Sequence, residues 1–302
     1  MWKEYAIEPA CVVQSREIFR FLLSNFGTEH GRWIVRLPST WKQQVNSALA
    51  TSPLLDVDRS RVIEWLKLDK GRFFGAGGDT FDLNAPWLPN ALRHHTSRPF
   101  AKILAVANPD AHTDVVIPEN EDDLTACLPS PHIVSVERSA PAIVSAAAPL
   151  LAKGNELLFI DPHFGPVARF LDVLQAALQN VARRIQKPQR IEYHFKARVS
   201  AAEFRQDWEH ALSRAIPAGL AVSFVAWNER TGGEQLHDRF ILAPIGGVDV
   251  TVGLDTGAAG QTTRITRLTA NTHTKIWADY QHGKPTAAFD LAPGFPITIS
   301  RP

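Results

Sequence analysis

Short apolar runs that alternate with longer amphipathic segments constrain the fold of this chain more than any other feature of its sequence. Three such runs lie in the second half of the chain, at residues 157–160, 190–195 and 220–227. Their length and apolar content are typical of buried β-strands. Strands separated by helices predict an α/β domain in which a βαβαβ unit forms a parallel sheet.

The two segments between these runs carry helical signals. Apolar residues recur at helical spacing from Val167 to Ile185, which predicts a helix with one buried face. Ser200, followed three residues later by Glu203, forms a capping-box pattern that predicts the start of a second helix. Each helix would connect two neighbouring parallel strands.

A hairpin is expected after this unit. Two apolar runs, at 240–244 and 248–253, flank the pair Gly246-Gly247. Glycine pairs between two strands are typical of hairpin turns. We expect this hairpin to close the sheet at one edge.

The first part of the chain mixes helical and strand signals. Helical patterns lie near 15–27 and 41–49, and strand-like runs lie at 33–37, 101–107 and 112–117. An acidic patch at 119–123, followed by two prolines, indicates a linker. We therefore divide the chain into a smaller mixed α+β domain at 1–130, of unassigned role, and an α/β domain at 131–302.

The composition of the 302 residues is that of a folded globular protein, with 45% hydrophobic and 21% charged residues. No apolar run is long enough to span a membrane. The charged N-terminal residues do not fit a secretory signal, so we expect a cytoplasmic protein. Two cysteines cannot build a disulfide framework and no metal-ligand spacing is present, so we expect neither a metal nor another cofactor.

His237 and Arg239 stand one residue apart at the start of the expected hairpin. This spacing resembles the HxKx4D motif of the phospholipase D superfamily, and Gly253 stands where that superfamily often has a Gly-Ser-x-Asn element. The resemblance covers roughly residues 135–300. It implies a phospholipase D-like domain with His237 as the nucleophile and Arg239 as the phosphate clamp.

The chemistry of such a motif requires no metal. A neutral imidazole attacks phosphorus and forms a phosphohistidine, which divides one difficult displacement into two easier steps. A second imidazole protonates the leaving oxygen. Fixed cations stabilise the charge on the phosphate oxygens.

The sequence departs from the motif at three positions: Arg239 replaces Lys, Pro244 replaces Asp and Leu254 replaces Ser. Arginine keeps the positive charge and can grip phosphate with two N–H groups. The missing carboxylate would have to come from Asp238, Asp249 or Asp255. These departures weaken the case for catalysis more than the case for the fold.

The chain has one such motif, whereas the two-step chemistry needs two imidazoles. A homodimer would supply a second copy of His237. Alternatively, His163 or His194 supplies it, since both lie near the ends of expected parallel strands, where functional residues gather. His194 fits a hydrogen-bonded strand residue better than a catalytic one, and for His163 the two interpretations are balanced.

Basic residues dominate the stretch between 183 and 198, where Glu192 is the single acidic residue. They are Arg183, Arg184, Lys187, Arg190, Lys196 and Arg198. A basic stretch beside the motif can bind a phosphate backbone, which favours DNA over lipid as the partner. The same pattern also fits a solvated helix end and loop without a ligand.

Two functions follow from these observations. The first is a metal-independent phosphodiesterase, above all a DNA nuclease, that acts as a homodimer or within a larger complex. Similar LHDR-type hairpins occur in bacterial proteins of poorly defined role, including some to which a part in phage defence is attributed. The second is a domain that has lost catalysis and binds nucleic acid, anionic lipid or a partner protein. It would be similar to the membrane-binding C-terminal domain of MIT-domain proteins.

Overall fold

The computed structural model describes residues 1–67, 74–75, 81–120, 122, 124–125, 128 and 131–301. The chain forms two compact units, Met1–His132 and Ile133–Pro302. The division placed at residue 130 from the sequence lies two residues before this boundary.

Unit 1 is built on a five-stranded sheet in the order β3-β2-β1-β4-β5, in which all pairings are parallel. Its strands are β1 (Lys3–Ile7), β2 (Arg32–Val35), β3 (Phe74–Gly75), β4 (Lys102–Leu104) and β5 (Val115–Val116). The unit is therefore α/β rather than the mixed α+β domain expected. The first strand escaped notice because charged residues flank a short apolar run, Tyr5–Ile7.

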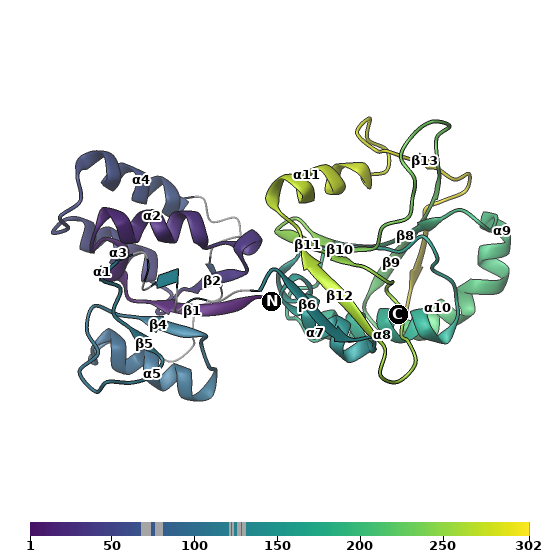
Figure 1. Cartoon of the computed structure of the whole chain (residues 1–302). Helices are drawn as coiled ribbons and strands as arrows, with labels where there is room; N and C mark the ends of the chain where they lie inside the picture. Colours follow the sequence, from purple (N-terminus) through teal and green to yellow (C-terminus); the bar gives the residue numbers. More distant parts are fainter. Residues whose placement is uncertain are drawn as a thin grey trace. The chain divides into compact units, whose positions relative to one another are not determined.

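Helices cover both faces of this sheet (Figure 1). They are α1 (Pro9–Val12), α2 (Arg16–Asn25), α3 (Trp41–Leu49), α4 (Asp56–Lys67) and α5 (Trp87–Ser97), with a 3-10 turn at Thr28–His30. The side chain of Ser15 accepts a hydrogen bond from the N–H of Ile18, which confirms the helix start expected there. Buried residues of α1 to α4 share one core, and α5 packs against the other face.

Unit 2 contains a nine-stranded mixed sheet, with the path β13-β9-β8-β7-β10-β11-β12-β6 and β14 paired to β9. Its strands are β6 (Ile133–Glu137), β7 (Glu156–Ile160), β8 (Arg190–Lys196), β9 (Ala221–Asn228), β10 (Phe240–Ala243), β11 (Gly246–Val250), β12 (Thr262–Arg267), β13 (Asp290–Leu291) and β14 (Ile297–Ser300). The strands β7, β8 and β9 are parallel neighbours, which confirms the expected βαβαβ unit.

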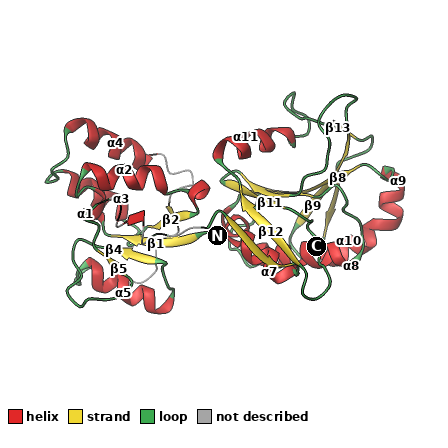
Figure 2. Ribbon diagram, viewed as in Figure 1, coloured by secondary structure: helices red, strands yellow, loops and turns green. Residues whose placement is uncertain are grey.

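The helices of unit 2 lie on both faces of its sheet (Figure 2). They are α7 (Ala140–Lys153), α8 (Ala168–Ala182), α9 (Ala201–Glu203), a π-helical turn (Phe204–Trp208), α10 (Glu209–Ala215) and α11 (Ala270–Asp279). The helices α7, α8 and α10 pack on one face, and α11 lies across the other. Ser200 and Glu203 form the expected capping box, with both reciprocal hydrogen bonds present.

The hairpin formed by β10 and β11 lies inside the sheet, so its expected place at an edge is wrong. The strand β10 pairs with β7, and β12 and then β6 extend the sheet beyond β11. Gly246 and Gly247 belong to β11, and the turn falls at Pro244-Ile245. The strand β12 was missed because its alternation of threonine and arginine looks polar, although Thr263, Ile265 and Arg267 are buried.

Among the helices of the described ranges, none is both long and apolar enough to cross a membrane.

Candidate phosphate-binding site

The candidate site lies at the edge of the unit 2 sheet where β7, β8 and β9 end. Because these strands are parallel, the segments that follow them meet at one edge. The strand β10 runs antiparallel to β7 with Phe240 opposite Ile160, which brings Arg239 to this edge as well. The sequence-predicted residues His163, Lys196, Arg198 and Arg239 therefore belong to one edge of the sheet.

Asp161, which directly follows β7, forms hydrogen bonds with two loops. Its carboxylate is buried, and the two oxygens accept hydrogen bonds from the backbone N–H groups of His163 (2.9 Å) and Leu254 (2.8 Å). Burial raises the pKa of Asp161, an effect that these two hydrogen bonds and the charge of Arg239 oppose. The buried carboxylate thus fixes where His163 lies relative to the 251–255 loop.

His163 is held as a neutral imidazole. Arg198 donates a hydrogen bond from Nη2 to Nδ1 of His163 over 2.8 Å, and a guanidinium can only donate. Partial burial and the charges of Arg198 and Arg239 lower the pKa of His163, against the opposing charge of Asp161. Since Nδ1 accepts, Nε2 carries the proton and can donate to an anion.

Arg239 and Tyr193 have polar atoms that are buried without a partner among the described residues, namely Nε of Arg239 and the hydroxyl of Tyr193. The charge of Arg239 acts on both Asp161 and His163. Burial, followed by the charges of Asp161 and Asp255, raises the pKa of Tyr193. Buried donors of this kind are normally satisfied. Arg239 directly precedes β10 at the candidate site, so its Nε indicates a place for a bound acceptor there, whereas Tyr193 stands in the middle of β8.

Asp255, predicted as a catalytic residue, is buried in this cluster and is engaged by two guanidinium groups. It forms an ion pair with Arg138 and a second with Arg169, whose Nε lies 3.5 Å from its carboxylate. A Cβ atom at Gly253 would lie 2.6 Å from Oδ1 of Asp255, so a larger residue there would collide with the carboxylate. Asp255 therefore holds arginine side chains in place.

His237, predicted as the nucleophile, has different neighbours. Its side chain is 66% exposed, Nδ1 lies 3.0 Å from the carbonyl oxygen of Gln235, and Nε2 lies 3.2 Å from Asp238. The nearby carboxylate of Glu229 pairs with Lys196 over 2.7 Å, and hydrogen bonds from Lys196 and from the N–H of Leu236 lower the pKa of Glu229. Within the described part of the chain, no hydrogen bond joins His237 to Arg239. The charge of Arg239 acts instead on His163.

The six cations predicted to bind phosphate do not form one surface. Lys196 ends β8 and Arg198 follows it at the candidate site, whereas Arg190 begins this strand at its opposite end, where it pairs with Glu156 over 2.6 Å. Arg184 donates to the carbonyl groups of Leu151 and Gly154, and Lys187 donates to those of Ala182 and Arg184. Arg183 is exposed at the end of α8. The six residues are close together in the sequence but not in the structure, because they are distributed between the end of a helix and the two ends of a strand.

The charges of the cluster favour an anion. Four guanidinium groups surround two buried carboxylates and a neutral imidazole: Arg138, Arg169, Arg198, Arg239, Asp161, Asp255 and His163. The excess positive charge and the Nε2–H of His163 match the oxygens of a phosphate group. Asp161, Arg138 and Arg169 were missed from the sequence. Asp161 could have been found, because it directly follows a strand that ends beside His163.

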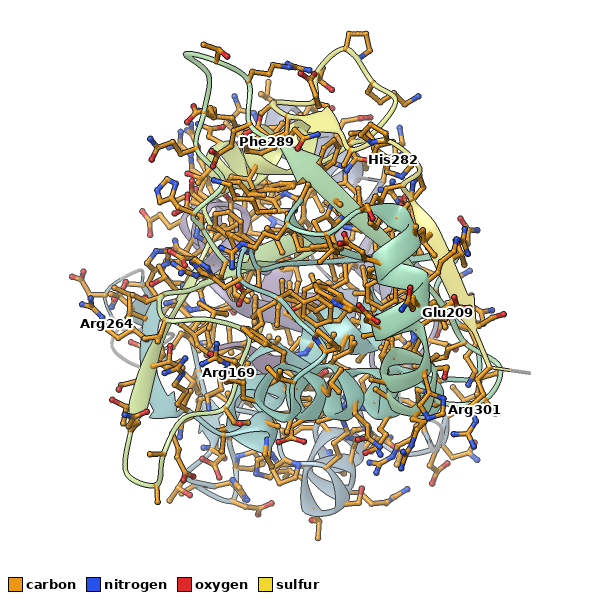
Figure 3. All side chains as sticks on the ribbon, turned by 90° about the vertical axis from the view of Figure 1, so that its right-hand side faces the viewer. Arg169, Glu209, Arg264, His282, Phe289 and Arg301 are labelled. Carbon is orange, nitrogen blue, oxygen red and sulfur yellow. The ribbon has the colours of Figure 1, made fainter. Side chains whose placement is uncertain are left out.

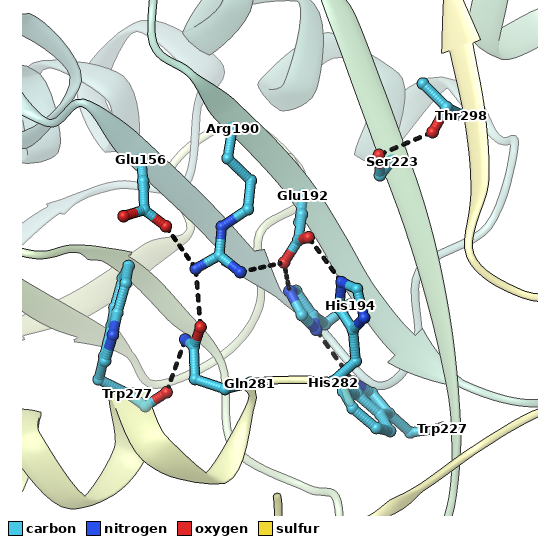
Figure 4. Close-up of polar contacts among 10 residues, drawn as sticks. All are labelled: Glu156, Arg190, Glu192, His194, Ser223, Trp227, Trp277, Gln281, His282 and Thr298. Atoms are coloured by element: carbon cyan, nitrogen blue, oxygen red, sulfur yellow. Dashed lines mark hydrogen bonds and ion pairs between the residues drawn. The ribbon is translucent and has the colours of Figure 1, made fainter. Parts of the chain in front are cut away.

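His194 belongs to a separate buried network (Figure 4). The indole N–H of Trp227 donates to Nδ1 over 2.9 Å, so Nε2 carries the proton and donates to Glu192 over 3.1 Å. His282 lies 2.9 Å from the other oxygen of Glu192. Burial lowers the pKa of His194. These contacts confirm that His194 is a hydrogen-bonded strand residue.

Glu192 carries the negative charge of this network. Its burial alone would raise its pKa, but hydrogen bonds from His194 and His282 and the charge of Arg190 lower it to about 2. Arg190 lies 3.6 Å from the carboxylate and also bonds Gln281 over 2.8 Å. The network ties β8 to the segment that follows α11.

No group of three or more histidine, cysteine, aspartate or glutamate side chains in the described segments is arranged to hold a metal ion. No protein-family model matches the chain, and no curated protein matches it. One solved structure with partial similarity is TrmBL2, described as an archaeal chromatin protein that shows a novel mode of DNA binding. The match has 8% identity and a TM-score of 0.28, and it covers 76% of this chain and 65% of the archaeal one.

Proposed function

We propose that unit 2 is a phospholipase D-like domain that binds a phosphodiester group at the ends of β7, β8 and β10, and that its ligand is DNA. One observation carries this proposal: the guanidinium groups of Arg198 and Arg239 act on His163, a neutral imidazole whose Nε2–H can donate to phosphate. The two guanidinium groups can only donate hydrogen bonds, and the acceptor nitrogen of His163, Nδ1, is already engaged by Arg198, so Nε2–H is left to donate.

Salt-dependent DNA binding tests this proposal. We expect Arg198→Gln and Arg239→Gln each to weaken binding about tenfold and to reduce the slope of log K against log salt by about 1, because one phosphate contact is lost. Fluorescence anisotropy with labelled duplex DNA measures both quantities. Arg214→Gln is the matched control, because Arg214 is exposed on α10, before β9 begins. Wild-type slopes in both site variants would overturn the proposal.

A metal-independent phosphodiesterase is the second candidate, and the geometry of His237 favours it. Nδ1–H of His237 donates to the Gln235 carbonyl, and Nε2 lies at the surface beside Asp238. In the proposed reaction Nε2 of one His237 attacks phosphorus, and the P–O bond to the leaving group breaks. The imidazolium of a second copy protonates the leaving oxygen, and water then cleaves the phosphohistidine. His163 is unsuited to the acid role, because Arg198 already donates to its Nδ1.

Nuclease assays in EDTA separate the two candidates. If the chain cleaves DNA by this route, His237→Ala abolishes cleavage and leaves binding intact, because binding rests on the arginines. Cleavage that persists in His237→Ala contradicts the catalytic role of this residue. If the wild type binds DNA without cleaving it, unit 2 is a phosphodiester-binding domain that does not catalyse this reaction.

A further inference from the structure

A pocket of unit 2 lies beside α11, away from the arginine cluster. Its volume is about 220 Å³, and both Asp238 and Phe240 line it. Arg239, which stands between them in the sequence, is not among its lining residues. Phe289, which also lines the pocket, is well separated from Arg169 in Figure 3.

Acidic side chains outnumber basic ones around this pocket. Glu234, Asp238 and Asp279 line it together with one cation, Lys275, which pairs with Glu234 over 3.3 Å. Asp279 forms neither an ion pair nor a side-chain hydrogen bond with any described residue, and burial raises its pKa. The pocket therefore carries an uncompensated negative charge.

Three aromatic rings form the apolar wall, and each is at least nine-tenths buried. They are Phe240, Tyr280 and Phe289, with centroids 6.5 Å apart for Phe240 and Tyr280 and 5.5 Å apart for Tyr280 and Phe289. Aromatic faces attract organic cations through their quadrupole, most strongly where water is excluded.

The hydroxyl of Tyr280 has no hydrogen-bond partner among the residues that the structure describes. The Tyr280 side chain is 4% exposed and lines the pocket. Its hydroxyl is affected by the charges of Asp238, Asp279 and Glu234, but it forms a hydrogen bond with none of them. The hydroxyl of a largely buried side chain that lines the pocket beside three carboxylates, without a partner among them, indicates that a ligand group belongs there.

We propose that this pocket binds an organic cation with N–H donors, a guanidinium or alkylammonium group. Carboxylates accept its hydrogen bonds, and the aromatic wall receives its alkyl or planar part. A metal ion fits less well, because the acidic side chains do not converge into a metal-binding group within the described residues. This site is independent of phosphate binding at the arginine cluster.

Isothermal titration calorimetry on the full chain tests this proposal. Argininamide represents a peptide side chain, putrescine a free amine, and citrullinamide is the uncharged counterpart of argininamide. We expect saturable binding of at least one cation, with a Kd of about a millimolar or tighter, and at least tenfold weaker binding of citrullinamide. Tighter binding of argininamide would indicate a peptide side chain as the ligand, and tighter binding of putrescine would indicate a free amine. Equal binding of argininamide and citrullinamide, or no saturable binding by either cation, would overturn the proposal.

Two variants and one control locate the site. Asp279→Asn removes a pocket charge with little change in shape and should raise the Kd about tenfold. Glu234→Gln changes an exposed residue at the rim, so its effect does not depend on the stability of the fold. Asp172→Asn makes the same change as Asp279→Asn on an exposed part of α8 and should leave the Kd unaltered. Unaltered binding in both pocket variants would place the ligand elsewhere and sink the proposal.

Discussion

Three histidines of unit 2 differ in role because their neighbours differ. An arginine donates to the ring of His163, a tryptophan donates to that of His194, and a carboxylate faces that of His237. The first two partners favour a neutral ring with its proton on Nε2, whereas the ring of His237 is exposed and lies beside Asp238. The partner of each ring nitrogen therefore decides whether a histidine can donate a proton, attack an electrophile or stabilise the core.

The indole N–H of Trp227 should contribute to stability in addition to the packing of its ring. Trp227→Phe keeps an aromatic side chain but leaves Nδ1 of the buried His194 without a donor, at a cost of about 1–3 kcal/mol. Urea unfolding measures this loss. Trp277→Phe is the control, because Trp277 is half-buried and its indole makes no hydrogen bond with the described residues. Equal losses in the two variants would show that the hydrogen bond contributes nothing of its own.

Glu192 should make the fold sensitive to acid. Its pKa is about 2 in the folded chain against an ordinary value of 4.5, so the unfolded chain binds the proton first as the pH falls. The stability that Glu192 contributes is present above pH 4.5 and is lost between 4.5 and 2. In Glu192→Gln the free energy of unfolding should fall less steeply across this range. Parallel pH profiles of variant and wild type would contradict this.

Some elements were predictable because local signals and tertiary packing agree. The strand β8 and the capping box at Ser200 are examples, since apolar content and the cap both lie in the local sequence. The helix α7 gave no such signal, because Pro141 and Pro149 interrupt its pattern. The place of the β10–β11 hairpin depends on β6 and β12, which lie far away in the chain.

The candidate site was also predictable only in part, namely where the local sequence carries a signal. His163, Arg198 and Arg239 could be named, since each stands at the end or the start of a recognisable strand. Their grouping, and the separation of Arg183, Arg184, Lys187 and Arg190 from them, depends on strand direction and pairing.

The capping box at the start of α9 should contribute measurably to stability. Ser200→Ala removes the hydroxyl that accepts the N–H of Glu203, and a lost N-cap costs about 1 kcal/mol. Thermal unfolding measures this cost. Ser213→Ala lies inside α10, where alanine is the better helix former, and should not lower the melting temperature. A melting temperature unchanged by Ser200→Ala would show that the cap is redundant there.

At the scale of the whole molecule, each unit has its own sheet and its own core. All polar clusters discussed above lie in unit 2. Unit 1 has a parallel sheet whose strand order reverses at β1, which is where ligands bind in other sheets of this type. Because both proposed binding sites lie in unit 2, they can be tested without assigning a role to unit 1.

The mass of the chain in solution bears on the catalytic candidate. Two copies of His237 can meet only if the protein self-associates, so the phosphodiesterase interpretation predicts a particle of twice 33.4 kDa. Light scattering coupled to size-exclusion chromatography measures this mass, alone and with DNA. A monomer under both conditions would eliminate the two-copy reaction and leave phosphodiester binding unaffected.

The pairing of β6 with β12 has a consequence for synthesis on the ribosome. Residues 133–137 emerge first among the strands of unit 2, yet their one neighbour in the sheet emerges more than a hundred residues later. Until then the nascent strand exposes unpaired backbone groups, which are prone to wrong pairing. Residues up to the end of β12 must therefore be translated before this sheet can close, and termination before that point would release a chain prone to aggregation.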